Sequence, residues 1–278
     1  MKKSLSFLII LTFCFIGHSQ VKEYGIFAGG VYYIGDINRE HFSQQQVSLG
    51  GVYKKDFPNN RVSLRYHLMY NQLKANDFKS GIADQINRNL SFKNDIIEFG
   101  PIIEFDFFTF QPGQNDPEQG SFGTPYFFAG INFMRMNPKA KTDDGEWVAL
   151  RDLATEGQGT RFNPTQKIYS LNQIVIPFGI GIKVNFSHHT SLCFEYGIRK
   201  TFSDYLDDVS GLYPNIPEYR IENLQAAQMS DRAKFKYGIN GTSSYGLQRG
   251  NSADKDWYMV SGIVLTYELF SDSSCPKW

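Results

Sequence analysis

Three acidic residues at the start of a long polar stretch are the first candidates for chemistry. Asp204, Asp207 and Asp208 lie within five residues of one another, directly after a strand-like segment. Hard cations such as Ca²⁺ take several carboxylate oxygens as ligands. The spacing matches no complete calcium loop, so we expect a solvated or helix-capping acidic turn in preference to a calcium site. The run Asp143-Asp144-Gly145-Glu146 is shorter still and is interpreted as a turn.

The histidines offer a second possible chemistry. His188 and His189 are adjacent in a short turn, where side chains diverge and no Cys or carboxylate completes a metal-ligand set. His67, with Arg65 on the same strand face, would suit a pH-sensitive pair or a catalytic group, and a hydrogen-bonded structural role is the commoner one. His41 is the single histidine in an outer loop, so a Ser/His/Asp constellation cannot be assembled. We therefore predict no catalytic, cofactor-binding or metal site.

Glycines in the segment Gly179-Ile180-Gly181-Ile182 superficially resemble a phosphate-binding loop. No third glycine follows at the required spacing, and the residues lie inside a strand pattern. Glycines in such a strand are expected to relieve crowding in a narrow interior. Pro177, two residues earlier, lacks a ladder donor, which predicts a bulge or an altered register there.

The elements that must position these residues are strands. Residues 61–72 are the clearest, because Val62, Leu64, Tyr66, Leu68 and Tyr70 alternate with polar residues over ten positions. The same alternation predicts eight strands, at residues 23–35, 47–54, 61–72, 97–107, 125–136, 174–186, 192–198 and 258–269. One short helix is expected in the stretch 222–235.

Charged residues occupy the minor face of these strands. They are Arg65, His67, Glu98, Glu104, Asp106, Lys183, Glu195, Arg199 and Glu268. In a dry protein core, such groups would each cost several kcal/mol unless paired. In a closed barrel they face the lumen, while lipid surrounds the apolar face. Eight strands enclose a space that side chains can fill, so we expect a paired plug that conducts no large solutes.

The connections between the predicted strands alternate in length. Residues 36–46, 75–90, 137–172 and 202–256 form the longer ones, and residues 55–60, 110–123 and 187–190 the shorter ones. Outer-membrane barrels have short periplasmic turns and longer extracellular loops, with both termini in the periplasm. A soluble sandwich gives no reason for this sorting.

The N-terminus has the layout of a signal peptide. Lys2 and Lys3 precede the apolar stretch 5–16, and small residues flank a cleavage position after Ser19. We predict three parts: a signal peptide at 1–19, one barrel domain at 20–270 and a short periplasmic tail at 271–278. Removal of the signal peptide takes Cys14 and leaves Cys193 and Cys275. These two either form one disulfide or remain a packed thiol and a tail thiol.

The composition excludes several classes of protein. The 28 Lys and Arg residues balance the 28 Asp and Glu residues, which gives no basic excess for nucleic acid. The chain is 41% hydrophobic and 20% charged, too apolar for a disordered protein. No run of 18 apolar residues follows the N-terminus, so no helical membrane span is expected. The 15% aromatic content and 25 glycines are typical of many short strands.

Several segments together resemble a known family. They are 24–30, 33–36, 155–158, 176–181, 199–210 and 256–267, of which Asp204-Tyr205-Leu206-Asp207-Asp208-Val209-Ser210 is the most specific. The chain resembles the DUF6089-like Bacteroidetes outer-membrane β-barrels typified by the type IX secretion system protein PorG. The resemblance implies a non-enzymatic barrel that associates with periplasmic lipoprotein and ring components of the secretion machine.

The sequence therefore predicts an all-β fold, an eight-stranded antiparallel transmembrane β-barrel in the cell outer membrane with long extracellular loops. The expected partners are outer-membrane lipid and, from the resemblance, periplasmic secretion-system proteins, with no nucleic acid and no small-molecule substrate. Residues 110–123 and the C-terminal tail are the expected docking surfaces. The alternatives are a general surface barrel for adhesion or envelope integrity and, third, a barrel hydrolase using His67 or Asp207.

Overall fold

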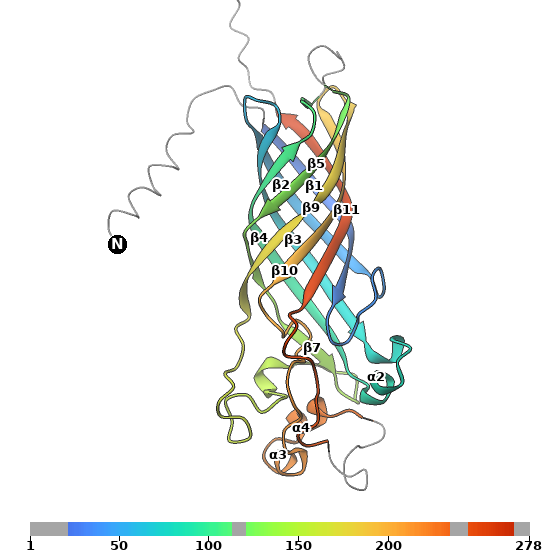
Figure 1. The fold of residues 1–278 in the computed structure, drawn as a ribbon, viewed down its shortest axis with the longest axis vertical. Helices are drawn as coiled ribbons and strands as arrows, with labels where there is room; N and C mark the ends of the chain where they lie inside the picture. The colour runs from blue at the N-terminus through green and yellow to red at the C-terminus, as the bar shows by residue number, and fades with distance from the viewer. Residues whose placement is uncertain (1–21, 113–120, 234–243, 270–278) are drawn as a thin grey trace, which may run out of the picture.

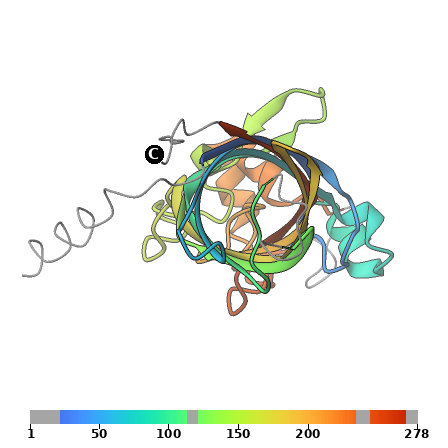
Figure 2. The same cartoon turned by 90° about the horizontal axis from the view of Figure 1, so that it is seen from above.

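The strands form one antiparallel sheet that closes into a barrel. The computed structural model describes residues 22–112, 121–233 and 244–269. Figure 1 shows the barrel from the side, and Figure 2 shows the closed ring along its axis. Eleven strands lie within the described residues: β1 (Lys22–Ile34), β2 (Gln46–Asp56), β3 (Val62–Asn76), β4 (Ser91–Asp106), β5 (Gly123–Gly130), β6 (Asn132–Arg135), β7 (Pro138–Lys141), β8 (Trp147–Ala149), β9 (Asn172–Ser187), β10 (Thr190–Thr201) and β11 (Trp257–Leu269).

Eight positions around the ring account for the wall of the barrel. The order is β3, β2, β1, β11, β10, β9, β5 and β4, and the pairing of β3 with β4 closes it. The predicted antiparallel barrel is confirmed, although eleven strands are present where eight were expected. Three strands are additional. Strand β6 continues β5 along the wall, while β7 pairs with the start of β4 and forms a hairpin with β8.

Two prolines explain why β5 and β6 are separate strands. The register of β5 and β6 against β4 places Pro101 opposite Ile131, and their register against β9 places Pro177 opposite Gly130. Since proline has no backbone N–H, each removes a ladder donor at this point. The bulge or altered register predicted at Pro177 is wrong, because its register with β10 continues unbroken and β5 and β6 keep one common register against β9. The missing donor instead interrupts the hydrogen-bond ladder between β9 and its other neighbour, at the gap between β5 and β6.

Side chains alternate between the lumen and the outer surface, as the sequence pattern predicts. In β4, every second residue from Phe92 to Asp106 is buried, and the residues between them are at least partly exposed. Large apolar side chains cover the outside, where Ile26 is 65% exposed and Leu68 59% exposed. The apolar residues therefore surround the barrel and do not form its centre.

The long and short connections lie at opposite ends of the barrel, as predicted (Figure 1). Lys22 pairs with Leu269, so the described chain begins and ends at the short-turn end. The long connections contain short helices: η1 (Asp77–Lys79), α2 (Ala83–Arg88), η2 (Arg151–Leu153), α3 (Ile216–Glu222) and α4 (Leu224–Ser230). Helix α4 lies within the predicted stretch 222–235, and α3 was not predicted. Each helix in the described residues is too short or too polar to cross a membrane.

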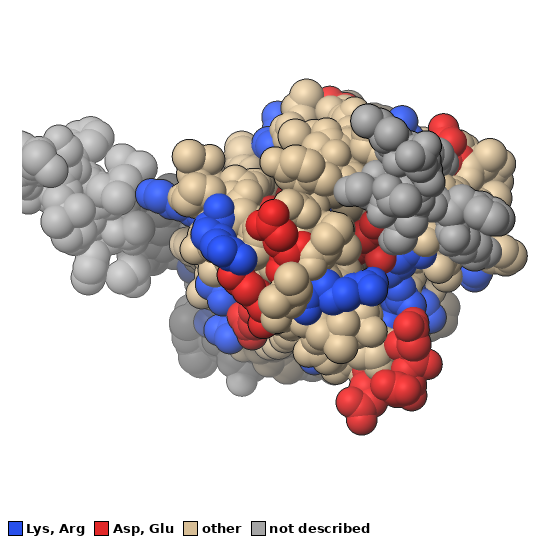
Figure 3. Space-filling model, turned by 90° about the horizontal axis from the view of Figure 1, so that it is seen from below, with Lys and Arg blue, Asp and Glu red and all other residues tan. Residues whose placement is uncertain are grey.

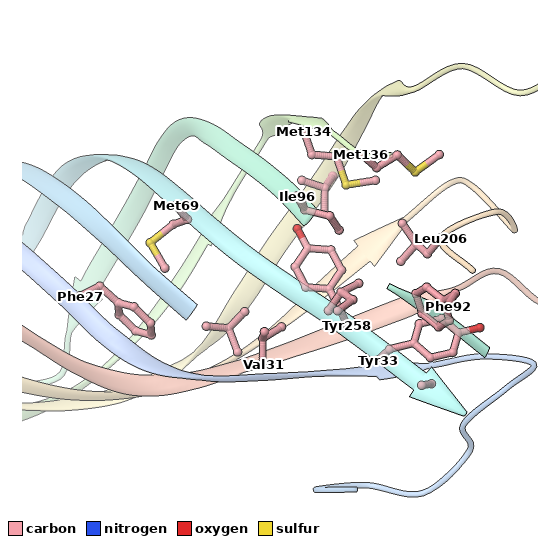
Figure 4. Packing of buried hydrophobic residues seen from close by; sticks show 14 of the residues in the cluster. Phe27, Val31, Tyr33, Met69, Phe92, Ile96, Met134, Met136, Leu206 and Tyr258 are labelled. Atoms are coloured by element: carbon pink, nitrogen blue, oxygen red, sulfur yellow. The ribbon is translucent and has the colours of Figure 1, made fainter. Parts of the chain in front are cut away.

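An apolar layer fills the barrel near its long-loop end. Phe92, Ile96, Met134 and Tyr258 point into this space together with Leu206 from the last long loop (Figure 4). All five are at most 2% exposed. The layer separates the charged lumen from the loops. The predicted signal peptide, the tail 271–278 and Cys275 lie outside the described residues.

Candidate functional site

Charged side chains interlock inside the barrel near its short-turn end. Lys183 Nζ lies 2.9 Å from Glu104 Oε2 and 2.8 Å from Asp106 Oδ1. Arg65 Nη1 lies 2.9 Å from Glu104 Oε1 and also contacts Glu195. All five side chains are buried. Because a buried charge is tolerated only with a partner, these residues form the paired plug that the sequence predicts.

A second group surrounds Glu98 in the middle of the lumen. Asn132 Nδ2 donates to Glu98 Oε1 at 2.6 Å, and the Tyr258 hydroxyl donates to Oε2 at 2.8 Å. His67 Nε2 lies 3.2 Å from Oε1, and Arg199 Nε lies 3.7 Å from Oε2. His67 is thus a hydrogen-bonded member of the plug, the commoner of the roles considered for it.

At the short-turn mouth of the barrel, the described part of the connection between β4 and β5 contacts the wall and the charged lumen. Phe110 is 3% exposed, its N–H donates to the Asn60 carbonyl at 3.0 Å, and Lys183 Nζ lies 5.7 Å from its ring centroid. Asn185 Nδ2 donates to the Gln111 carbonyl at 3.2 Å. Residues 113–120 of this predicted docking surface lie outside the described residues.

The two longest loops fold together at the opposite end. We call residues 150–171 and the described part of 202–256 the loop cap. The carboxylate of Glu156 accepts hydrogen bonds from the N–H groups of Ser210 at 2.8 Å and Gly211 at 3.1 Å. Arg249 Nη1 lies 3.1 Å from the same carboxylate, and its Nη2 lies 3.7 Å from Asp208 Oδ2. Glu156 and Arg249 are both buried, so this ion pair joins the two loops from inside.

Arg88, at the end of α2, ties the loop cap to the shorter outer loops. Its Nε and Nη2 contact the Asp77 carboxylate at 2.8 and 2.7 Å. The same side chain donates to the backbone carbonyls of Asp36 at 2.8 Å and Arg249 at 2.7 Å. Three separate connections therefore meet at one guanidinium. Figure 3 views this end of the molecule and shows acidic and basic side chains interspersed.

Tyr33 links two carboxyl groups beneath the loop cap. Its hydroxyl oxygen lies 2.5 Å from Asp207 Oδ2 and 2.9 Å from Asp256 Oδ1. Burial, followed by the nearby charge of Asp36, raises the pKa of Asp207 well above its usual range. Burial and the charge of Asp207 do the same to the pKa of Asp256. Since a tyrosine hydroxyl carries one hydrogen, one of the two carboxyls must hold a proton if both contacts are hydrogen bonds.

The acidic run at 204–208 differs from the solvated or helix-capping turn that we expected. Asp204, Asp207 and Asp208 are 4%, 1% and 0% exposed. Asp208 accepts hydrogen bonds from the Tyr169 hydroxyl at 2.7 Å and from Thr155. The expected solvated turn is wrong because residues from distant parts of the chain pack over these carboxyl groups and donate hydrogen bonds to them. No group of three or more His, Cys, Asp or Glu residues in the described chain is placed to hold a metal ion.

A hollow opens beside this acidic run, between the first and last outer loops. Its volume is about 350 Å³. Asp36, Asp204 and Asp256 line it together with Arg39 and Lys255. Both signs of charge therefore face the opening, which suits a polar ligand better than a bare cation.

The remaining candidates from the sequence have structural surroundings. His188 and His189 occupy the turn between β9 and β10, where His189 Nδ1 lies 3.9 Å from Glu268 Oε2. The Tyr32 hydroxyl lies 3.2 Å from His41 Nδ1. Residues 143–145 form the turn predicted there. Cys193 is a buried free thiol.

Sequence reasoning missed the residues that organise the outer loops. Arg249, Arg88 and Asp77 belong to no motif and carry no periodicity. Glu156 and Asp36 fall inside segments that carry the family resemblance, and this was the available signal for them. The contacts themselves join distant residues, such as Asn251 and Asp36 at 215 positions apart, a separation that local patterns do not reveal.

The chain is similar to one protein family and to several solved outer-membrane proteins. A family model described as "Domain of unknown function (DUF6089)" matches residues 2–246, and no curated protein matches the chain. Among solved structures, a major outer membrane protein from Thermus thermophilus has a TM-score of 0.41 at 9% identity, covering 91% of this chain and 100% of that one. Neisserial surface protein A has a TM-score of 0.39 at 10% identity, covering 90% and 96%. Outer membrane protein W of E. coli has a TM-score of 0.35 at 10% identity, covering 91% and 100%.

Proposed function

The chain belongs to the DUF6089 family, and we propose that it is a non-enzymatic outer-membrane β-barrel that anchors periplasmic parts of a secretion machine. The observation that carries the membrane location is the outer surface of the barrel. Ile180 and Phe186 are 65% and 72% exposed there. Monomeric soluble proteins rarely expose contiguous apolar surface of more than a few hundred Å², whereas membrane barrels need it around their full circumference.

Aromatic residues at both ends of this apolar surface support the same location. At the long-loop end, Trp147 is 43% exposed, and Lys200 Nζ lies 5.5 Å from the ring centroid of Trp257. At the short-turn end, Phe108 and Phe122 are 54% and 63% exposed. Aromatic rings of this kind gather at membrane–water interfaces. The two ends of the barrel therefore fit the two interfaces of one bilayer.

The filled lumen favours an anchor over a solute pore. Lys183, Arg65 and Glu98 are each paired inside the wall, and Phe110 lies under the short-turn mouth. A swelling assay with liposomes that contain the folded chain tests this point. We expect no swelling in sugar solutions, and rapid swelling would contradict a sealed barrel.

The secretion role rests on the resemblance to the PorG-type barrels. The resemblance implies association with periplasmic lipoprotein and ring components of the secretion machine, and the short-turn end of this barrel is the surface that would face them. The test is affinity purification of a tagged chain from membranes in mild detergent. Periplasmic ring or lipoprotein components should co-purify, and their absence in a sample that retains the folded barrel would count against the anchor role.

A second function is favoured by the folded outer loops. The loop cap is organised around the buried Arg249 and Glu156 pair and presents a hollow of about 350 Å³, as expected of a surface barrel that binds an external ligand. A chain that lacks residues 205–250 separates the two functions. Loss of adhesion with secretion intact would favour the surface barrel, and adhesion and secretion that both stay unchanged would favour an anchor that works through the opposite end.

A further inference from the structure

The outer wall carries a groove where β4, β6 and β9 meet near the long-loop end. Its volume is about 660 Å³, within the roughly 300–1,000 Å³ of ligand pockets. Phe99, Phe133, Ile174 and Phe202 supply its apolar lining, and each is about half exposed. Phe133 is the cross-strand neighbour of both Phe99 and Ile174, and the two phenylalanine rings stack with centroids 5.7 Å apart. The groove is therefore a continuous apolar surface that faces away from the lumen.

Arg135 stands at the loop-side end of this groove. It follows Phe133 by two residues on the same face of β6, and it pairs with Ile97 of β4 and Asn172 of β9. The outward side chains of β6 and β9 thus change from apolar to polar at this level. Arg135 also lines an adjoining hollow of about 210 Å³ together with Lys139. One guanidinium therefore connects an apolar groove with a polar hollow.

The charge at this junction is positive. Within the described part of the chain, the side chains of Arg135 and Lys139 make no hydrogen bond or ion pair. Asp95 also lines the hollow, but Lys93 Nζ lies 3.1 Å from its carboxylate and the Tyr70 hydroxyl donates to it at 2.7 Å. Two unpaired cations therefore remain beside a carboxylate that already has its partners.

We propose that this groove binds a membrane lipid with an anionic phosphate headgroup. The proposal rests on the membrane location given above. An acyl chain lies along Phe99, Phe133 and Ile174, and the phosphate contacts Arg135 and Lys139. The planar guanidinium of arginine matches phosphate with two parallel hydrogen bonds. Trp147, with Lys93 and Lys141 at 5.9 and 5.5 Å from its ring centroid, marks the interfacial level that such a headgroup occupies.

Native mass spectrometry of the mature chain, released from non-ionic detergent, tests the site. The probes are dioleoyl phosphatidic acid, dioleoyl phosphatidylcholine with the same chains, and glycerol phosphate with no chain. A basic residue at a membrane surface strengthens binding of anionic lipid by about fivefold. We therefore expect Arg135→Gln and Lys139→Gln each to weaken phosphatidic acid binding by about fivefold and to leave phosphatidylcholine binding unchanged. Lys79→Gln, at an exposed loop position outside the groove, is the matched control and should bind as the unaltered chain does.

Comparing the binding of the two lipids and of glycerol phosphate shows whether the groove takes an anionic lipid, any lipid or a free phosphate. Preferential binding of phosphatidic acid that Arg135→Gln removes would support the site. Equal binding of both lipids, equally tight binding of glycerol phosphate, or a chain dimer that Arg135→Gln abolishes would overturn it. Insertion into liposomes is measured in parallel by co-sedimentation. If the unaltered chain inserts without selective lipid binding, only the lipid site fails; if it does not insert, the proposed membrane function fails as well.

Discussion

Arg249 Nη1 lies 3.1 Å from Glu156 Oε1, and these two residues are 93 positions apart in the chain. Both side chains are buried, at 2% and 0% exposed. The pair holds together two loops that extend from different strands, and the same guanidinium donates to the backbone carbonyl of Asp208. The outer end of the barrel is therefore a folded structure whose closure depends on a few buried contacts.

Replacing Arg249 should open the loop cap without unfolding the barrel. Arg249→Met leaves the carboxylates of Glu156 and Asp208 buried without their cation, and loss of one partner of a buried pair costs about 3–5 kcal/mol. Hydrogen exchange should then accelerate at the Ser210 and Gly211 amides, which donate to Glu156. Amides of the strands should keep their protection.

Arg161→Met is the matched control for that change. Arg161 pairs with Glu222 in the same loop assembly, but the two side chains are 63% and 42% exposed. Exposed pairs contribute about 0–1 kcal/mol, so exchange at Ser210 and Gly211 should hardly change. Equal effects of the two substitutions would contradict the role assigned to Arg249.

The stability of the barrel itself should depend on Lys183. Lys183→Met removes the cation between Glu104 and Asp106 and should lower the free energy of unfolding by about 3–5 kcal/mol. The urea midpoint of the folded band in gel-shift electrophoresis measures this loss. Adding Glu104→Gln and Asp106→Asn should recover part of it, because no uncompensated buried charge remains. No recovery would mean that packing, and not charge, explains the effect.

Closure of the loop cap should weaken as the pH rises. Burial raises the pKa of Asp204 to about 7 and that of Asp208 to about 6. Both carboxyls hold their protons more tightly in the closed state, so their stabilising contribution is complete below pH about 4 and is lost as the pH rises through 6 to 7. Hydrogen exchange at Ser210 and Gly211, corrected for the intrinsic rate, should be faster at about pH 8 than at about pH 5. Asp204→Asn should reduce this difference in exchange rate between the two pH values. Equal or slower exchange at the higher pH would contradict the prediction.

Position 181 has no room for a side chain, because Tyr126 packs directly against Gly181 inside the barrel. A Cβ at Gly181 would lie 2.5 Å from Tyr126 Cζ, so Gly181→Ala should cost about 1–3 kcal/mol through overpacking. Gly51, on the outer face of β2, has no atom within 4 Å of such a Cβ. The urea midpoint should therefore fall for Gly181→Ala and stay within error for Gly51→Ala. Equal midpoints would show that the wall relaxes around the added methyl group.

The wall of the barrel was predictable because apolar and polar residues alternate along each strand and so identify its two faces. Leu68 and Ile103 alternate with His67 and Glu104 in the sequence, and the same residues lie outside and inside the barrel. The hairpin of β7 and β8 was not predictable in this way, because Pro138–Lys141 and Trp147–Ala149 are too short to show a period. The separation of β5 from β6 depends on prolines in two neighbouring strands, of which only Pro177 was considered.

The outer end was the least predictable part, for a different reason. Asp207 and Asp208 look like solvated carboxylates in the sequence, and their burial depends on Tyr33, Thr155 and Tyr169 from distant segments. Loop residues follow no regular pattern, so one sequence alone does not show which distant residues will contact these carboxyl groups. The charges of the lumen were placed on the correct face, but the pairing of Lys183 with Glu104 and Asp106 needed the register of neighbouring strands.

If the protein is an anchor, the short-turn end of the barrel contacts the secretion machine. Site-specific photocrosslinking in intact cells tests this directly. A photoreactive side chain is placed at Asn59 or His188, in two of the three connections at the short-turn end, and at Arg161 or Ile221, which are exposed in the loop cap. The anchor role predicts crosslinks to periplasmic secretion components from Asn59 and His188 and none from Arg161 and Ile221. Crosslinks from the loop-cap positions alone, in cells where all four variants reach the outer membrane, would contradict it.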